Sequence, residues 1–174
     1  MAPDERVSQL TPGNREVSGL QTEILRTILL VEDESTDATL LLRGFEKAQV
    51  MNPVVHLTSG DEALGYLAGV REYGDRRKYP LPALILLDLK LPGMTGIQLL
   101  QWMRVQGEIR RIPVVVLTSD SNPDTIDAAY DLGANSYLVK PGNSADIARM
   151  VQAIQRYWVK LNEPPQLVMR AGQE

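Results

Sequence analysis

Five short apolar runs recur along the chain, at residues 27–31, 53–58, 83–88, 113–118 and 136–139. Stretches in which apolar residues have helical spacing separate these runs. Because the runs are apolar without alternation, they are typical of strands buried on both faces of a parallel sheet that helices cover on each side. Right-handed crossovers leave few topologies for such strands, and the simplest is a doubly wound α/β sandwich, (βα)5, around a five-stranded parallel sheet.

Helix signals between the runs agree with this alternation. The first helix is expected from about Thr36 to Gln49, and Ser59-Gly-Asp-Glu62 is typical of a capping box that opens the second. Other residues that commonly begin or end helices fall between the later runs: Thr95, Asn122-Pro123, Gly133, Asn143 or Ser144, and Glu163-Pro164-Pro165. The last helix is expected to carry one apolar stripe of Ile147, Met150, Val151, Ile154, Trp158 and Leu161.

Composition excludes several classes of function. The 174 residues include no cysteine and one histidine, His56, to which we assign no chemistry, so disulfides, thiolate catalysis and cysteine- or histidine-rich metal sites are excluded. A net charge of −4 argues against nucleic acid or an anionic membrane as a partner. No run is long enough to cross a membrane and the first residues are too polar for a signal peptide, so a cytoplasmic location is the default expectation.

Polar residues stand at the ends of four of the runs. Glu32 and Asp33 follow the first, and Asp88 ends the third; Thr118 ends the fourth, and Lys140 follows the fifth. The ligand crevice of a doubly wound sheet lies at the carboxyl ends of its strands, so these side chains are expected to converge. Clustered carboxylates repel one another unless a cation lies among them, and oxygen ligands select Mg²⁺, Mn²⁺ or Ca²⁺. The pattern predicts a phosphoryl-transfer site with a carboxylate acceptor.

Four segments in this order resemble the receiver domain of two-component response regulators, the CheY-like form of this sandwich. They are Ile28-Leu-Leu-Val-Glu-Asp33, Leu84-Ile-Leu-Leu-Asp88 with Leu91-Pro92 and Gly96 after it, Val115-Val-Leu-Thr-Ser119, and Tyr137-Leu-Val-Lys-Pro141. The resemblance covers residues 26–161. It leaves residues 1–25 as an N-terminal extension and residues 162–174 as a C-terminal tail.

The resemblance implies a role for each matching acidic residue. Asp88 would be the phosphoacceptor, which takes a phosphoryl group from the phosphohistidine of a sensor kinase. Asp33, Asp88 and the backbone carbonyl of Lys90 would bind Mg²⁺, or Mn²⁺ in its place, and Glu32 would reach the ion through water.

The resemblance also implies roles at the fourth and fifth runs. Thr118 would be the switch hydroxyl that closes on the phosphoryl group, and Lys140 the ion-pair partner of the phosphoryl oxygens, with a cis bond to Pro141. Tyr137 would either turn inward when Thr118 moves or simply pack.

Lys90 and Asp120 stand two residues beyond Asp88 and Thr118. In receivers the side chains at these positions tune how fast water attacks the acyl phosphate. A lysine–aspartate pair could either shield the phosphoryl group or position water, so the sequence leaves the lifetime of the phosphorylated state open.

Three features resemble the small regulators that partner phytochrome-type histidine kinases: a receiver without an output domain, a long 70–82 segment, and a last helix that runs into Tyr157-Trp158-Val-Lys-Leu161 and then prolines. In that group the face made by the fourth helix, fifth strand and fifth helix mediates homodimers. Tyr157, Trp158 and Leu161 are expected either in the core or in an exposed dimer patch. The basic residues of the 70–82 segment are expected to form a solvated loop: Arg71, Arg76, Arg77 and Lys78.

The expected function is a signalling switch whose only reactions are self-phosphotransfer and slow autodephosphorylation, and so not an enzyme in the ordinary sense. One alternative is a pseudo-receiver, an interaction module that dimerises without phosphorylation. A haloacid-dehalogenase-type phosphatase would need a second aspartate where Lys90 stands. A flavodoxin-like cofactor binder would need a phosphate loop rich in hydroxyl and Asn side chains after the first strand, which is absent from the sequence.

Overall fold

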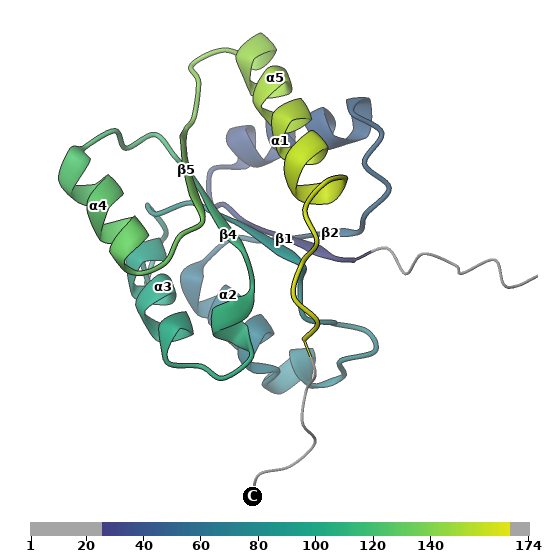
Figure 1. Cartoon of the computed structure of the whole chain (residues 1–174), viewed down its shortest axis with the longest axis vertical. Coiled ribbons are helices and arrows are strands. Elements are labelled where there is room, and N and C mark those ends of the chain that lie inside the picture. The colour runs from purple at the N-terminus through teal and green to yellow at the C-terminus, as the bar shows by residue number, and fades with distance from the viewer. Residues whose placement is uncertain (1–25, 168–174) are drawn as a thin grey trace, which may run out of the picture.

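The computed structural model describes residues 26–167, and the predicted N-terminal extension lies outside that range. Strands and helices alternate in the predicted order (Figure 1). The strands are β1 (Ile28–Val31), β2 (Val54–Leu57), β3 (Leu84–Leu87), β4 (Val114–Thr118) and β5 (Ser136–Val139). The α-helices are α1 (Ser35–Lys47), α2 (Gly60–Ala68), α3 (Gly96–Arg104), α4 (Pro123–Asp131) and α5 (Ser144–Ile154). Short 3-10 turns occupy Arg71–Gly74 and Ile109–Arg111.

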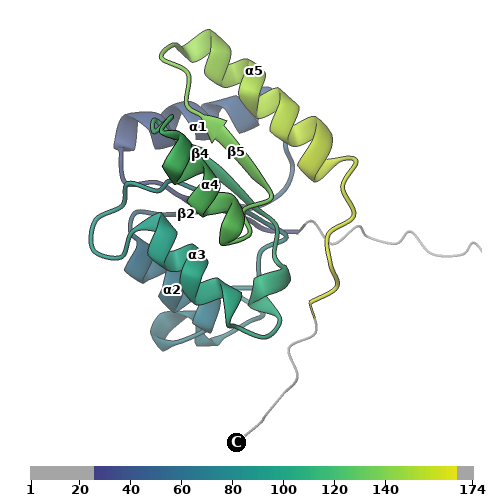
Figure 2. The same ribbon diagram turned by 60° about the vertical axis from the view of Figure 1, so that its left-hand side comes forward.

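The strands form one parallel sheet in the order β2-β1-β3-β4-β5, which confirms the predicted doubly wound sandwich. Helices α1 and α5 cover one face of the sheet, and α2, α3 and α4 cover the other (Figures 1 and 2). Alternate residues of β1 supply the two layers, because Ile28 and Leu30 join the α1/α5 cluster while Leu29 and Val31 join the opposite one. Each fully buried side chain of this size contributes about 1.5–3 kcal/mol to folding.

Helix starts follow the predicted caps with two differences. Asn122 and Asn143 cap α4 and α5, and Thr95 forms a complete capping box with Gln98 at α3. At α2 the box is only half formed, because the Ser59 hydroxyl accepts a hydrogen bond from the backbone of Glu62 while the Glu62 carboxylate accepts from the backbone of Thr58. Helix α1 begins at Ser35, capped by the Glu34 carboxylate.

The end of the last helix widens into a π-helical turn at Gln155–Val159. The side chain of Gln155 donates a hydrogen bond of 2.6 Å to the carbonyl of Ala48, which is the C-cap residue of α1. This contact satisfies a carbonyl that the helix itself leaves without a partner. The turn therefore fixes the end of α5 against the end of α1.

Residues 162–167 leave this turn as an extended segment. The carbonyl of Pro164 accepts a weak hydrogen bond of 3.5 Å from Arg26, and Leu167 packs against the cluster under α2, α3 and α4. In Figure 1 the segment descends from α5 toward the layer that contains α2. It therefore connects the two helical layers around the sheet.

Two sequence predictions about loops are wrong. No peptide bond within residues 26–167 is cis, so the bond between Lys140 and Pro141 is trans, which is the intrinsically favoured isomer of an X–Pro bond. Arg76 does not lie in a solvated loop, although Arg71, Arg77 and Lys78 are exposed as predicted. Within residues 26–167, no helix combines the length and the apolar character that crossing a bilayer requires.

Arg76 lies instead against the carboxyl end of α2. Its guanidinium donates hydrogen bonds to the carbonyls of Tyr66 at 2.7 Å, Leu67 at 2.6 Å and Tyr79 at 3.2 Å. Tyr66 and Leu67 lie in the last turn of α2, where the Tyr66 carbonyl has only a 3.2 Å hydrogen bond from the backbone of the C-cap residue Gly69 and a cation interacts favourably with the helix dipole. Arg76 thus connects the 70–82 segment to the core.

Replacing Arg76 with alanine should lower the free energy of unfolding by about 1–3 kcal/mol, because buried carbonyls lose charged hydrogen-bond partners. Urea unfolding followed by circular dichroism measures the change. The matched control is Arg77→Ala, since the Arg77 side chain is 94% exposed. That control should shift stability by less than about 0.5 kcal/mol. Equal effects of the two substitutions would contradict the capping role of Arg76.

Candidate functional site

The predicted polar residues meet at the carboxyl edge of the sheet. The backbone N–H of Glu32 donates to the carbonyl of Leu57 at 3.0 Å, and that of Asp88 donates to Val31 at 2.9 Å. The backbone N–H of Lys140 donates to Thr118 at 2.8 Å. These bonds continue the strand pairing by one residue, so each polar side chain is held at the end of a rigid strand.

The ammonium group of Lys140 lies among three carboxylates. Its Nζ is 2.5 Å from Oε2 of Glu32, 2.6 Å from Oδ2 of Asp88 and 3.0 Å from Oδ2 of Asp37. As whole residues Glu32 and Asp88 are 1% and 6% exposed, so Lys140 compensates charges that would otherwise be costly to bury. Burial alone would lower the pKa of Lys140, but its hydrogen bonds to Asp88, Glu32 and Asp37 outweigh burial and raise that pKa.

Glu32 is the most deeply buried of the carboxylates. Desolvation by burial raises its pKa to about 7, against the opposing effect of its contact with Lys140. Its Oε1 accepts a hydrogen bond of 3.2 Å from the backbone of Glu34, and its own carbonyl lies 2.8 Å from Nε2 of His56. His56 therefore contacts the backbone of a site residue, a contact that no pattern in the sequence indicates.

The acidic side chains fit a hard divalent cation. Carboxylate oxygens of Glu32, Asp33 and Asp88 all lie within 4.8 Å of one another, and Asp33 is exposed at the rim. A donor set made only of oxygen atoms suits Mg²⁺ or Mn²⁺. The other oxygen of Asp88, Oδ1, accepts a hydrogen bond of 3.1 Å from the backbone of Lys90, which fixes the start of the loop after β3.

Thr118 and Tyr137 lie next to this cluster on β4 and β5. Thr118 is fully buried, and its hydroxyl accepts a long hydrogen bond of 3.4 Å from the backbone of Asp120. The Tyr137 hydroxyl donates to the Asp120 carbonyl at 3.0 Å. Burial raises the pKa of Tyr137, with smaller contributions from Asp120 and Asp88. The carboxylate of Asp120 accepts from the backbone of Asn122 at 2.8 Å and so shapes the turn before α4.

The alternation of side chains places these groups on two sides of the sheet. Glu32, Asp88 and Lys140 continue the positions that face α1 and α5, as the contact of Lys140 with Asp37 on α1 confirms. Thr118 continues the positions of β4 that face the opposite layer. Tyr137 packs against that opposite layer too.

Asp37 is the site residue that the sequence analysis missed. It lies in the first turn of α1, one helical turn after Asp33, and its side chain is 33% exposed. The i, i+4 spacing from Asp33 is the only signal in the sequence, and an acidic residue in a first turn is ordinarily explained by the helix dipole.

The three residues of the predicted dimer patch are divided between core and surface. Tyr157 and Leu161 are 54% and 68% exposed, whereas Trp158 is half-buried against the α1/α5 cluster. The rings of Tyr157 and Trp158 meet edge to face with centroids 4.9 Å apart. An apolar surface therefore continues outward from the core at this end of the molecule.

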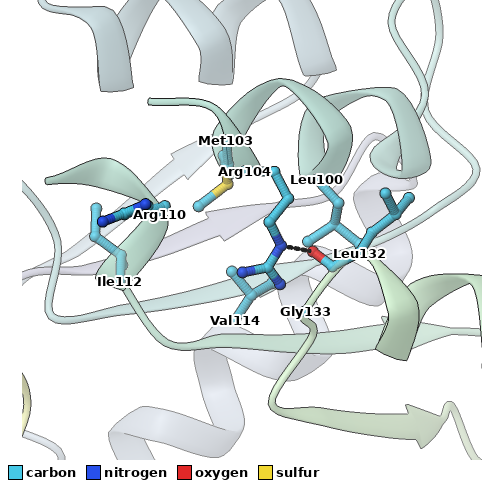
Figure 3. A pocket seen from close by; sticks show the side chains of 8 residues that line it. All are labelled: Leu100, Met103, Arg104, Arg110, Ile112, Val114, Leu132 and Gly133. Atoms are coloured by element: carbon cyan, nitrogen blue, oxygen red, sulfur yellow. Dashed lines mark hydrogen bonds between the residues drawn. The ribbon is translucent and has the colours of Figure 1, made fainter. Parts of the chain in front are cut away.

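A small hollow at the opposite edge of the sheet is a structural feature rather than part of this site. Its lining residues come from α3, from the end of the segment before β4 and the first residue of β4, and from the two residues after α4, and they include Leu100, Met103, Val114 and Leu132 (Figure 3). Arg104 reaches across it and donates a hydrogen bond of 2.7 Å to the carbonyl of Leu132, the C-cap residue of α4.

Comparison with known proteins gives a family match over most of the chain. The model of the response regulator receiver domain matches residues 28–152. The chain is 39% identical over 146 residues to the probable methanogenesis regulatory protein FilR2 of Methanothrix harundinacea, covering 84% of this chain and 92% of that protein. It is 36% identical over 135 residues to response regulator Rcp1 of Synechocystis, covering 78% of this chain and 90% of Rcp1.

Solved structures give the same result. The phosphorylated cyanobacterial phytochrome response regulator RcpA superposes with a TM-score of 0.76 at 35% identity, covering 81% of this chain and 99% of RcpA. The Mn²⁺-bound form of Rcp1 superposes with a TM-score of 0.75 at 36% identity, covering 81% of this chain and 99% of that one.

In the metal-free protein, stability should fall as pH rises from about 4.5 to about 7. The reason is that the folded state holds the Glu32 proton with a pKa of about 7, above the ordinary value of 4.5, so the folded state binds more protons than the unfolded state across this range. Urea unfolding in EDTA at a series of pH values measures the slope. Glu32→Gln should flatten it, whereas Glu46→Gln, at an exposed position of α1, should not. Identical slopes in all three proteins would refute the assignment to Glu32.

Proposed function

The chain belongs to the response regulator receiver domain family, and from this premise we propose that it accepts a phosphoryl group from a sensor histidine kinase on Asp88. The observation that carries the proposal is the position of Asp88 at a strand end, 6% exposed, with a lysine ammonium 2.6 Å from one carboxylate oxygen. A carboxylate at such a position is rigid, partly desolvated and reachable from the crevice.

The proposed transfer makes one bond and breaks one bond. A carboxylate oxygen of Asp88 bonds to phosphorus while the bond from phosphorus to the imidazole nitrogen of phosphohistidine breaks, and the imidazole leaves with the electron pair. The product is an acyl phosphate on Asp88. Its slow hydrolysis returns the free carboxylate, so self-phosphotransfer and autodephosphorylation are the only reactions in the proposal.

We propose that Asp33, Asp88 and the backbone carbonyl of Lys90 hold Mg²⁺, with Glu32 reaching the ion through water. The divalent ion would offset negative charge between the acceptor and the incoming phosphoryl group. The oxygen-only cluster of Glu32, Asp33 and Asp88 supports this assignment, as does the similarity to Rcp1, which was solved in a Mn²⁺-bound form.

Lys140 and Thr118 are the residues that would read the phosphorylated state. In the proposal Lys140 turns an N–H toward a phosphoryl oxygen, and the buried Thr118 hydroxyl donates to another. Movement of Thr118 would disturb its contact with Asp120, whose carbonyl accepts from Tyr137. These contacts would favour an active arrangement of α4 and β5 by shifting a population that already exists.

We propose a phytochrome-type histidine kinase as the partner and the cytoplasm as the location. The support is similarity to Rcp1 and to RcpA, the latter a phytochrome response regulator solved in phosphorylated form. We also keep residues 26–161 as the receiver, between the extension at residues 1–25 and the tail at residues 162–174. A pseudo-receiver that dimerises without phosphorylation is the alternative, and the intact acidic cluster argues against it.

Incubation with acetyl phosphate and Mg²⁺ should add one phosphoryl group to the wild-type protein and none to Asp88→Asn, because the amide is not a nucleophile for phosphorus. Intact mass spectrometry measures the gain. Asp131→Asn, an exposed aspartate of α4, is the control that should label like wild type. Absence of labelling in wild type, at a donor concentration that labels a known receiver, would favour the pseudo-receiver instead.

We propose further that the chain forms a homodimer through the face of α4, β5 and α5, extended by the dimer patch of Tyr157, Trp158 and Leu161. Exposed apolar side chains on this face support the proposal, since Tyr130 and Val139 are 48% and 46% exposed. In the proposal these side chains form parts of one interface, since a contiguous exposed apolar surface is typical of a protein–protein contact.

The double substitution Tyr157→Ser, Leu161→Ser should shift the protein toward the monomer in size-exclusion chromatography with light scattering, because it removes apolar area from the patch. Val105→Ser is the control, as Val105 is 80% exposed and lies outside this face at the end of α3. The sizing is run with and without acetyl phosphate, which shows whether phosphorylation alters assembly. A dimer that survives the double substitution would exclude these two side chains from the interface.

A further inference from the structure

Asp37 contacts Lys140 in a way that differs from the other two carboxylates. The Lys140 ammonium group forms ion pairs with three carboxylates, those of Glu32, Asp88 and Asp37, and donates hydrogen bonds to Asp88 and Asp37. Glu32 and Asp88 belong to the group of carboxylates that could hold a cation, together with Asp33. Asp37 is not part of that group.

A divalent cation and the Lys140 ammonium would therefore compete for the negative charge of two carboxylates, those of Glu32 and Asp88. Two of the three partners of Lys140 would have to share their charge with the cation or be given up to it. The third, Asp37, lies on α1 outside the cation group, at 3.0 Å from Nζ. Lys140 would thus retain one carboxylate partner however the other two are occupied.

The environment of Asp37 suits a carboxylate that remains the partner of Lys140 when a cation binds. Its side chain is 33% exposed, against 1% for Glu32 and 8% for Asp88, so its charge stays hydrated at little cost when Lys140 moves. Within residues 26–167, Lys140 is the only cationic residue that forms an ion pair with any of these carboxylates. Asp37 is therefore placed to act on the site through Lys140.

We propose that Asp37 is a positioning residue, which holds the Lys140 ammonium at the rim of the site when a divalent cation binds to the neighbouring carboxylates. This inference rests on the proposed function, in which Lys140 contacts the phosphoryl group on Asp88. Held by Asp37, the Lys140 ammonium would stay within reach of that group. Without Asp37, the only carboxylate partners of Lys140 would be Glu32 and Asp88, which both belong to the cation group, and Lys140 would compete with the cation more strongly.

The test is isothermal titration calorimetry with Mn²⁺ alone, and then Mg²⁺ alone, in the absence of any phosphodonor. Asp37→Asn should raise the Kd for Mn²⁺ about threefold to tenfold, as expected for the loss of a partly exposed ion pair. Asp37→Glu should restore most of the affinity. Glu46→Gln removes the same charge from an exposed position of α1, and should change the Kd less than about twofold.

Repeating the substitution in a Lys140→Met variant distinguishes an effect of Asp37 that acts through Lys140 from a direct electrostatic effect of Asp37 on the cation. In Lys140→Met, the further substitution Asp37→Asn should leave the Kd nearly unchanged, because the residue through which Asp37 acts is gone. A shift of the same size in both backgrounds would overturn the proposal, and so would a shift in Asp37→Asn no larger than in Glu46→Gln. If Lys140→Met does not fold by circular dichroism, the comparison of Asp37→Asn, Asp37→Glu and Glu46→Gln decides alone.

The two proposals fail separately in this design. Cation binding is measured without phosphoryl transfer, so an unchanged Kd in Asp37→Asn rejects the role of Asp37 and leaves phosphorylation of Asp88 untouched. Failure of the proposed function would instead appear as wild-type protein that gains no phosphoryl mass.

Discussion

The ion pairs of Lys140 are the interactions on which the carboxyl edge of the sheet depends. Burying Glu32 and Asp88 without a cation would cost several kcal/mol, and Lys140 compensates both from the end of β5, which is separated from β1 and β3 by β4. One ammonium cannot neutralise the four carboxylates of Glu32, Asp33, Asp37 and Asp88, however. The remaining negative charge makes a divalent cation a favourable ligand. The carboxylates that are costly to bury are therefore the same ones that would bind the cation and accept a phosphoryl group.

Most of the fold was predictable from the sequence, because its signals are local. The five apolar runs mark strands whose bounds differ from prediction by about one residue. Thr95, Asn122 and Asn143 stand just before apolar residues with helical spacing, where such side chains favour N-caps, and each is a cap in the structure. Convergence of Asp88, Thr118 and Lys140 was predictable because strand ends in a parallel sheet share one edge.

What the sequence could not indicate depends on contacts that a side chain makes outside its own helix, strand or loop. Arg76 reads as one of several solvated basic residues until α2 is seen to end beside it. Asp37 reads as an ordinary first-turn aspartate, because Lys140 lies 103 residues away. The π-helical turn after α5 is held in the same way by the contact of Gln155 with Ala48, which lies 107 residues away. A charged residue in the sequence could equally be a helix cap, a metal ligand or a counter-ion, and only its tertiary contacts show which of these it is.

The division of the site between the two sides of the sheet has a mechanical consequence. Elsewhere the sheet separates the two hydrophobic clusters, so a side-chain movement in one cluster reaches the other only through movement of the strands. At the carboxyl edge, Asp88 and Lys140 belong to the side of α1 and α5, while Thr118 and Tyr137 belong to the side of α3 and α4. A charge added at Asp88 would therefore act on both layers directly. The side chains of the α1/α5 layer and those of the opposite layer would respond to it together, without the strands having to bend.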